Sequence, residues 1–271
     1  MKQIAVYFDS WASKWVGQPG DMDLAKLDLP GLTIVNLAFV KPDLTYAKGQ
    51  GSFAGTGLDF SQEFWVVKGA ISILRSRGIK VMLSVGGSTY NNWDGLNTAS
   101  LDALVMDLGV DGVDIDWEVG GVRKFYGLIG IICEVHDFVH GCISIAAFST
   151  GAFGSDGVDQ WKGSAIPAMV HCGGFISWIN VMAYDAGAGF DSVGAYDCYR
   201  IYYPGDLLLG FEVGPPGWGG YLLTTADVER GVNHVKKDGT GNGVFVWSVG
   251  SNESGTPSVR DICTLANKSF Q

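Results

Sequence analysis

Eight apolar runs rich in β-branched residues recur along the chain, and its 40 glycines are spread between and around them. Such residues favour β-strands, and glycine at the ends of apolar runs is typical of strand-to-loop connections. Hydrophobic residues make up 47% of the chain, which is ample material for a large core. The runs predict eight strands, near residues 3–9, 32–40, 79–85, 110–117, 142–148, 176–184, 206–213 and 243–249.

Segments with helical spacing separate many of these strands. In residues 61–77, Phe64, Val67, Ile71 and Leu74 recur at the intervals of one helix face. Similar patterns predict helices at 97–108, 121–140, 224–237 and 257–267, with Thr224 or Thr225 and Pro257 or Ser258 opening the last two.

The alternation of strands and helices predicts an α/β fold, a parallel (β/α)8 TIM barrel. An open doubly wound sheet is the alternative, but no Gly-x-Gly-x-x-Gly follows the first strand. No linker or block of charge divides the sequence, so we expect a single domain over residues 1–271.

Charge and the N-terminal sequence limit partners and location. The net charge is −10, which makes nucleic acid and anionic membranes unsuitable partners. No apolar run is long enough to span a bilayer. We expect no secretory leader within this sequence, because residues 4–8 already begin a predicted strand. We expect a monomer that is either cytoplasmic, or extracellular after removal of a leader.

The five cysteines give no metal-ligand spacing, and their odd number leaves at least one unpaired within a monomer. Most are expected to be small buried side chains. If the protein is secreted, one or two disulfide bonds are an alternative to free thiols.

Residues 111–118 read Asp-Gly-Val-Asp-Ile-Asp-Trp-Glu, in which acidic and apolar residues alternate. On a strand, Asp114, Asp116 and Glu118 would share one face at steps of about 6–7 Å. Close carboxyl groups with limited access to water cannot all be ionised. Such a ladder favours a site in which one carboxyl stays protonated near neutral pH and acts as a general acid.

The spacing Asp-x-x-Asp-x-Asp-x-Glu resembles the catalytic signature of glycoside hydrolase family 18, the chitinases and their relatives, and all its acidic positions are filled here. A second segment, Ser84-Val85-Gly86-Gly87, resembles the Ser-x-Gly-Gly signature of that family. Glycines there would let the backbone turn beside the acidic cluster, and Ser84 could hydrogen-bond a carboxylate.

Other strand ends resemble further elements of the family. Met182-Ala183-Tyr184-Asp185 matches its Met-x-Tyr-Asp element, and Trp247 occupies the position of a tryptophan that lies beneath the cleaved sugar. Tyr7 and Phe39 resemble positions that line the bottom of the site. The additional candidates are Glu212, which is either in the cleft or a solvated strand-end charge, and Trp93 and Trp218, which are either exposed contacts flanking the cut or surface packing.

The resemblance implies a retaining endochitinase that cleaves β-1,4-linked N-acetylglucosamine in chitin or chitooligosaccharides, without metal or cofactor. Glu118 would be the acid, with Asp116, Asp114 and Tyr184 assisting the substrate's own acetamido group. The alternatives are an endo-β-N-acetylglucosaminidase acting on N-glycans and a non-catalytic chitin-binding lectin. Many relatives carry an α+β module between strands seven and eight; only about thirty residues separate these strands here, which predicts an open cleft.

Overall fold

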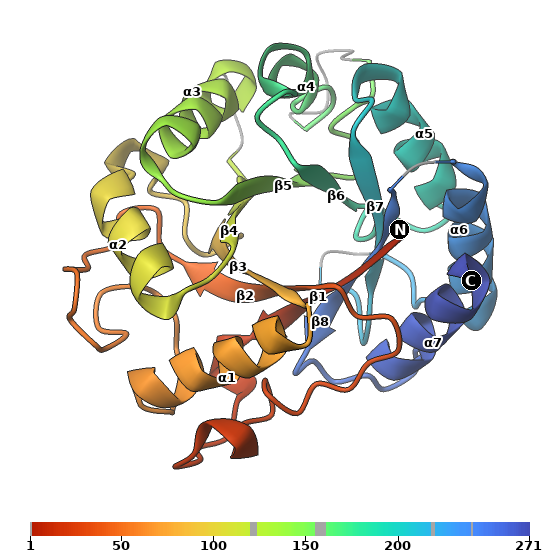
Figure 1. Cartoon of the computed structure of the whole chain (residues 1–271). Coiled ribbons are helices and arrows are strands. Elements are labelled where there is room, and N and C mark those ends of the chain that lie inside the picture. The colour runs from red at the N-terminus through yellow and green to blue at the C-terminus, as the bar shows by residue number, and fades with distance from the viewer. Residues whose placement is uncertain (1, 120–123, 155–160, 218–219, 240) are drawn as a thin grey trace.

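The computed structural model describes residues 2–119, 124–154, 161–217, 220–239 and 241–271. Eight parallel strands close into a barrel in sequence order, which confirms the predicted (β/α)8 fold (Figure 1). The strands are β1 (Gln3–Asp9), β2 (Ile34–Val40), β3 (Lys80–Gly86), β4 (Gly112–Asp116), β5 (Cys142–Phe148), β6 (Trp178–Met182), β7 (Asp206–Glu212) and β8 (Gly243–Val249).

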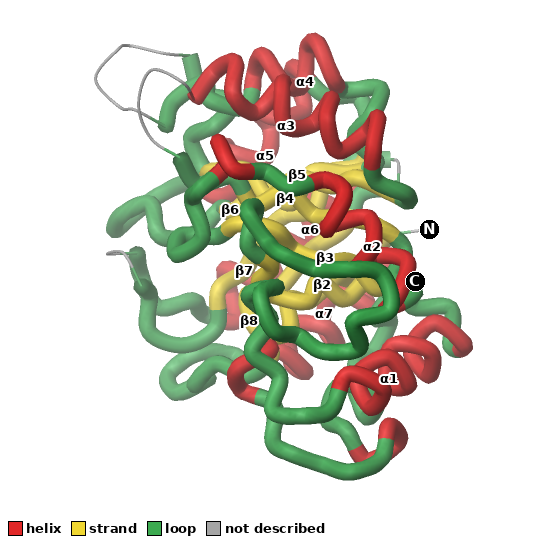
Figure 2. The backbone as a smooth tube through the Cα atoms, turned by 90° about the vertical axis from the view of Figure 1, so that its left-hand side faces the viewer, coloured by secondary structure: helices red, strands yellow, loops and turns green. Residues whose placement is uncertain are grey.

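Helices surround the strands, which lie at the centre of the molecule (Figure 2). They are α1 (Phe64–Ser76), α2 (Thr98–Leu108), α3 (Lys124–Phe138), α4 (Ile166–Cys172), α5 (Ser192–Tyr202), α6 (Thr225–Lys237) and α7 (Val259–Phe270). Thr224 and Ser258 cap α6 and α7, each in a capping box with the aspartate three residues later. The connection from β1 to β2 contains short 3-10 turns instead of an α-helix.

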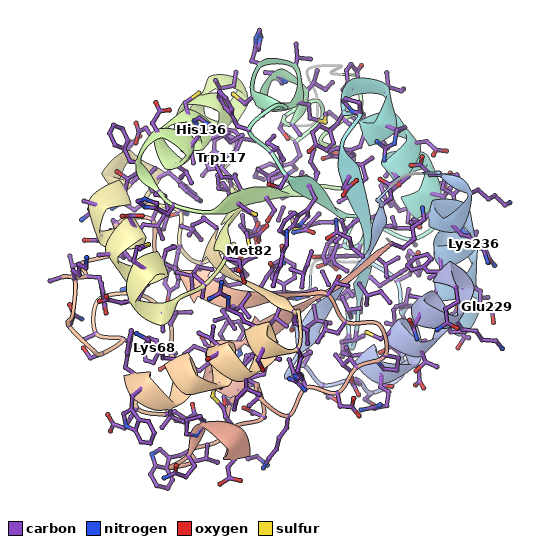
Figure 3. The ribbon with its side chains drawn as sticks, viewed as in Figure 1. Lys68, Met82, Trp117, His136, Glu229 and Lys236 are labelled. Atoms are coloured by element: carbon purple, nitrogen blue, oxygen red, sulfur yellow. The ribbon has the colours of Figure 1, made fainter. Side chains whose placement is uncertain are left out.

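Two cores result from the alternation of side chains along the strands. The outer core lies between the barrel and the helices, and Val113, Ile115 and Trp117 belong to it. The inner core fills the barrel with residues such as Tyr7, Met82, Trp178 and Phe245. Figure 3 shows Met82 near the barrel centre and Trp117 on the side of α3. Among the described residues, no helix is both long and apolar enough for a membrane span.

Candidate active site

The acidic segment lies where β4 ends. Asp114 and Asp116 belong to the strand, which stops at Asp116, so Trp117 and Glu118 follow it. Asp114 is fully buried and Asp116 is 4% exposed, whereas Glu118 is only partly buried. The carboxyl groups therefore run from the barrel interior toward its carboxyl end, where TIM barrels place their chemistry.

Asp114 is held by hydrogen bonds from several strands. Its Oδ2 accepts from Tyr7 Oη and Ser84 Oγ, both at 2.8 Å. Its Oδ1 accepts from Ser144 Oγ at 2.6 Å and from Asn180 Nδ2 at 3.0 Å. Burial raises the pKa of Asp114, and these hydrogen bonds oppose that rise. The network fixes the Asp114 carboxylate inside the barrel, two residues before Asp116 on the same strand.

Asp116 and Glu118 bind protons more tightly than ordinary carboxyl groups. Burial, the charge of Glu118 and the charge of Asp114 raise the pKa of Asp116 well above its usual range. Burial and the charge of Asp185 raise the pKa of Glu118 to about 7, although the Ser88 backbone N–H opposes this by donating a hydrogen bond. Glu118 is thus protonated in part near neutral pH, as a general acid must be.

Gly86 and Gly87 allow β3 to pass close to the end of β4. Both have positive φ angles, 107° and 74°. A Cβ on Gly86 would lie 2.1 Å from the backbone oxygen of Asp116, and one on Gly87 would lie 3.0 Å from the Phe39 ring. The Gly87 backbone N–H donates to the Asp116 carbonyl at 2.9 Å. A larger residue at position 86 would therefore have to move the acidic segment, and one at position 87 would have to shift the Phe39 ring.

Residues at the ends of β6 and β7 face the same region. Tyr184 and Met182 pack against the inner core. Burial, followed by the charges of Asp116, Glu212 and other carboxylates, raises the pKa of Tyr184 well above 10, so its hydroxyl stays a hydrogen-bond donor. Asp185 has a left-handed backbone with φ of 51°, which is uncommon outside glycine.

Glu212 belongs to this group and is not a solvated strand-end charge. It lines a small cavity together with Tyr184 and Asp185. Burial, the charge of Asp185 and a hydrogen bond with Asp185 raise the pKa of Glu212 to about 8. Burial is the largest of these causes, and the neighbouring Asp185 carboxyl adds to it.

An aromatic row forms the other side of the site. The Trp247 ring stacks on Phe39 with centroids 5.4 Å apart and meets Tyr7 edge-on at 5.6 Å. Phe39 in turn stacks on Trp11 at 6.3 Å, and Trp11 is 50% exposed. The row thus continues from the inner core to the surface, and Trp11 is a member that the sequence analysis missed.

Trp93 and Trp218 were predicted either as exposed contacts flanking the cut or as surface packing. Trp93 is not an exposed side chain: it is 8% exposed, and a Cβ on Gly86 would lie 2.6 Å from its ring. It is buried because the turn after β3 folds it back over the strand end. Trp218 lies outside the described residues.

Asp111, the first acidic residue of the motif, stabilises the packing of neighbouring elements. Its carboxylate pairs with Arg75 of α1 at 2.8 Å and accepts from the Val81 backbone N–H at 2.9 Å. These bonds tie the start of β4 to β3 and α1. Asp111 therefore does not join the site formed by the other acidic residues.

Ser144 and Asn180 were also missed by the sequence analysis. The only signal was a polar residue within an apolar strand, in Ile143-Ser144-Ile145 and Ile179-Asn180-Val181. That signal does not name a partner, because the partner depends on strand register. Here Ser84, Asp114 and Ser144 lie in register across β3, β4 and β5. Within the described part of the chain, no cluster of three metal-ligand side chains occurs.

A family model of known proteins matches this chain over residues 3–198, and its description is glycosyl hydrolases family 18. The chain belongs to this family. Family 18 is one of the families in which the substrate assists its own hydrolysis.

Individual relatives agree with the family assignment. A chitinase of Plasmodium falciparum is 33% identical over an alignment of 138 residues, and the match covers 46% of this chain and 34% of that protein. The match thus spans about a third of that relative's length.

Solved structures share the barrel. A GH18 chitinase from Pseudoalteromonas aurantia has a TM-score of 0.71 at 21% identity, covering 99% of this chain and 100% of that one. A fungal endo-beta-N-acetylglucosaminidase of the same family has a TM-score of 0.71 at 19% identity, covering 100% and 97%. At these identities the likeness shows the fold alone.

Proposed function

We propose that this family 18 member hydrolyses β-1,4 linkages between N-acetylglucosamine residues in chitin or chitooligosaccharides, with retention of configuration and cleavage within the chain. The observation that carries the proposal is the position of Glu118 at the mouth of the barrel. Its pKa of about 7 lets it hold and release a proton near neutral pH. The ordered Asp116 and Asp114 lie beneath it.

In the proposed reaction, Glu118 protonates the glycosidic oxygen as the bond to the anomeric carbon breaks. The substrate's acetamido oxygen attacks that carbon and forms a cyclic oxazolinium ion. Water then opens this intermediate while Glu118, now ionised, accepts its proton. Two inversions at one carbon give net retention.

Asp116 accepts a hydrogen bond from the acetamido N–H and stabilises the positive charge that develops on the ring. Its Oδ1 is buried without a hydrogen-bond partner among the described residues, so it is free for this bond. Asp114 shares a proton with Asp116, which relieves the repulsion between them. Tyr184, with its hydroxyl protonated, holds the acetamido oxygen in line for attack.

The aromatic row contacts the carbohydrate. Trp247 supplies a flat surface for the apolar face of the sugar at the point of cleavage, and Phe39 and Tyr7 fix the indole ring. Met182, Asp185 and Glu212 would line the opposite wall.

An enzyme that releases N-glycans would use the same catalytic residues. Only an assay of the substrate that is cleaved distinguishes chitin hydrolysis from N-glycan release. The test incubates the protein in parallel with soluble chitin oligosaccharides and with an N-glycosylated protein. Reducing sugar from the oligosaccharides alone is expected. Glycan release alone would replace the proposal, and binding without any hydrolysis would favour a lectin.

The mechanism has its own test. The first product should be the β-anomer, and fully deacetylated oligomers should remain intact because they lack the internal nucleophile. Early accumulation of the α-anomer in NMR spectra, before mutarotation, would exclude the retaining mechanism.

A further inference from the structure

Two thiols meet between α3 and α4, outside the candidate active site. Cys133 of α3 and Cys172 at the end of α4 have their Sγ atoms 3.9 Å apart. The two helices lie next to each other around the barrel (Figure 1). The His136 ring of α3 also stacks on Phe175, which follows α4, with centroids 3.9 Å apart. The two thiols are therefore held together by the packing of both helices.

We propose that Cys133 and Cys172 form a redox-active thiol pair, which a small-molecule disulfide such as oxidised glutathione converts into a disulfide bond. A disulfide has an S–S length near 2.05 Å, so the sulfur atoms must approach by about 2 Å. No other contact between cysteine thiols is present in the described part of the chain.

The exposure of the two side chains sets the order of the steps. Cys133 is partly exposed, whereas Cys172 is 2% exposed. Burial, together with the neighbouring Cys133, raises the pKa of Cys172 to about 11. Because the thiolate is the nucleophile, Cys133 is the side chain that meets the oxidant first.

The exchange balances without any further reagent. The Cys133 thiolate attacks one sulfur of oxidised glutathione, forms a mixed disulfide and releases one glutathione thiolate. Cys172 then loses its proton, attacks the Cys133 sulfur and releases the second glutathione thiolate. Two protons and two electrons pass from the protein to give two molecules of reduced glutathione.

The bond would join residues 39 apart in sequence and enclose β5. Closing such a loop restricts the unfolded chain. We therefore expect the oxidised protein to melt roughly 5–15 °C above the reduced protein.

The test treats the purified full chain with oxidised glutathione, denatures it, and alkylates the remaining thiols before mass spectrometry. The expected result is three alkylated cysteines instead of five, with a peptide crosslink between Cys133 and Cys172. Five alkylated thiols, a crosslink elsewhere, or a stable mixed disulfide at Cys133 would each overturn the proposal.

Matched variants separate the pair from the other thiols. Cys263→Ser removes a buried cysteine outside the pair, and the variant should still form the crosslink. Cys133→Ser should form none, and its melting temperature should no longer respond to glutathione. Because the mapping uses the wild-type chain, poor folding of a variant does not affect the main result. A crosslink is expected whether or not the protein hydrolyses chitin.

Discussion

The proposed chemistry depends on a single proton at Glu118. Glu118→Gln keeps the size of the side chain but cannot protonate the leaving oxygen. We expect hydrolysis of chitin oligosaccharides to fall by about 10²–10⁴-fold, while binding of the oligosaccharide persists. Glu229→Gln, at an exposed position on α6, is the matched control and should retain full activity. Turnover like that of the wild type in the Glu118 variant would remove this residue from its role.

The same proton predicts the dependence of activity on pH. Because the pKa of Glu118 is raised to about 7 by burial and by Asp185, its protonated form decreases above that pH. We expect kcat/KM to fall about tenfold per pH unit on the basic side, once the pH exceeds 7. A profile flat from pH 6 to pH 9 would contradict a proton-donating role for Glu118.

The acidic residues of the motif could be predicted because their spacing alone identifies them. Their hydrogen-bond partners could not all be predicted. Asp114 is bound by Tyr7, Ser84, Ser144 and Asn180, which come from four different strands. The sequence indicated Ser84 as a carboxylate partner. It gave no basis for Ser144 or Asn180, since register across a barrel is a property of the folded sheet.

At the scale of elements, the strands were predictable and the helices less so. Predicted and observed strand bounds differ by at most two residues at either end, because strands buried on both faces are continuous apolar runs. Helices α4 and α5 were not predicted. Helix α4 has only seven residues, and α5 buries Tyr196 and Tyr199 in place of an aliphatic stripe.

Trp247, near the end of β8, is expected to contribute to oligosaccharide binding. Trp247 is packed between Phe39 and Tyr7, and its ring is the proposed floor of the site. Trp247→Ala should weaken oligosaccharide binding by about 1–3 kcal/mol, by analogy with the loss of an aromatic stacking partner. Titration calorimetry measures this, with the exposed Trp65→Ala of α1 as control. An unchanged melt with unchanged affinity would reduce Trp247 to a core residue.

A buried carboxyl group lies where β1 meets β8, and it is expected to make the stability of the fold depend on pH. Asp9 is 3% exposed and accepts a hydrogen bond from Ser248 Oγ at 3.0 Å, and its Oδ1 has no partner among the described residues. Burial raises its pKa to about 6, and the Ser248 hydrogen bond opposes the rise. The folded state thus binds this proton more tightly than the unfolded state. The contribution to stability is full below about pH 4 and is lost as pH rises toward 6.

Asp9→Asn removes this titration. The free energy of unfolding of the variant, relative to wild type, should increase by about 1–3 kcal/mol between pH 4 and pH 7. Urea unfolding at both pH values measures the difference, and Asp28→Asn, whose side chain is 94% exposed, is the control. A constant difference would show that the Asp9 carboxyl does not titrate on its own in this range.

For the whole molecule, the short connection from β7 to β8 predicts the mode of attack. Its described residues, 213–217, 220–239 and 241–242, contain α6 and connecting loops but no strand, so they build no second sheet beside the cleft. A cleft without such a wall admits the middle of a polymer and holds it weakly after each cut. We therefore expect endo-acting, weakly processive hydrolysis. On a soluble chitin derivative, viscosity should drop long before reducing ends accumulate. Slow loss of viscosity, with the dimer as the sole early product, would show that another loop encloses the chain.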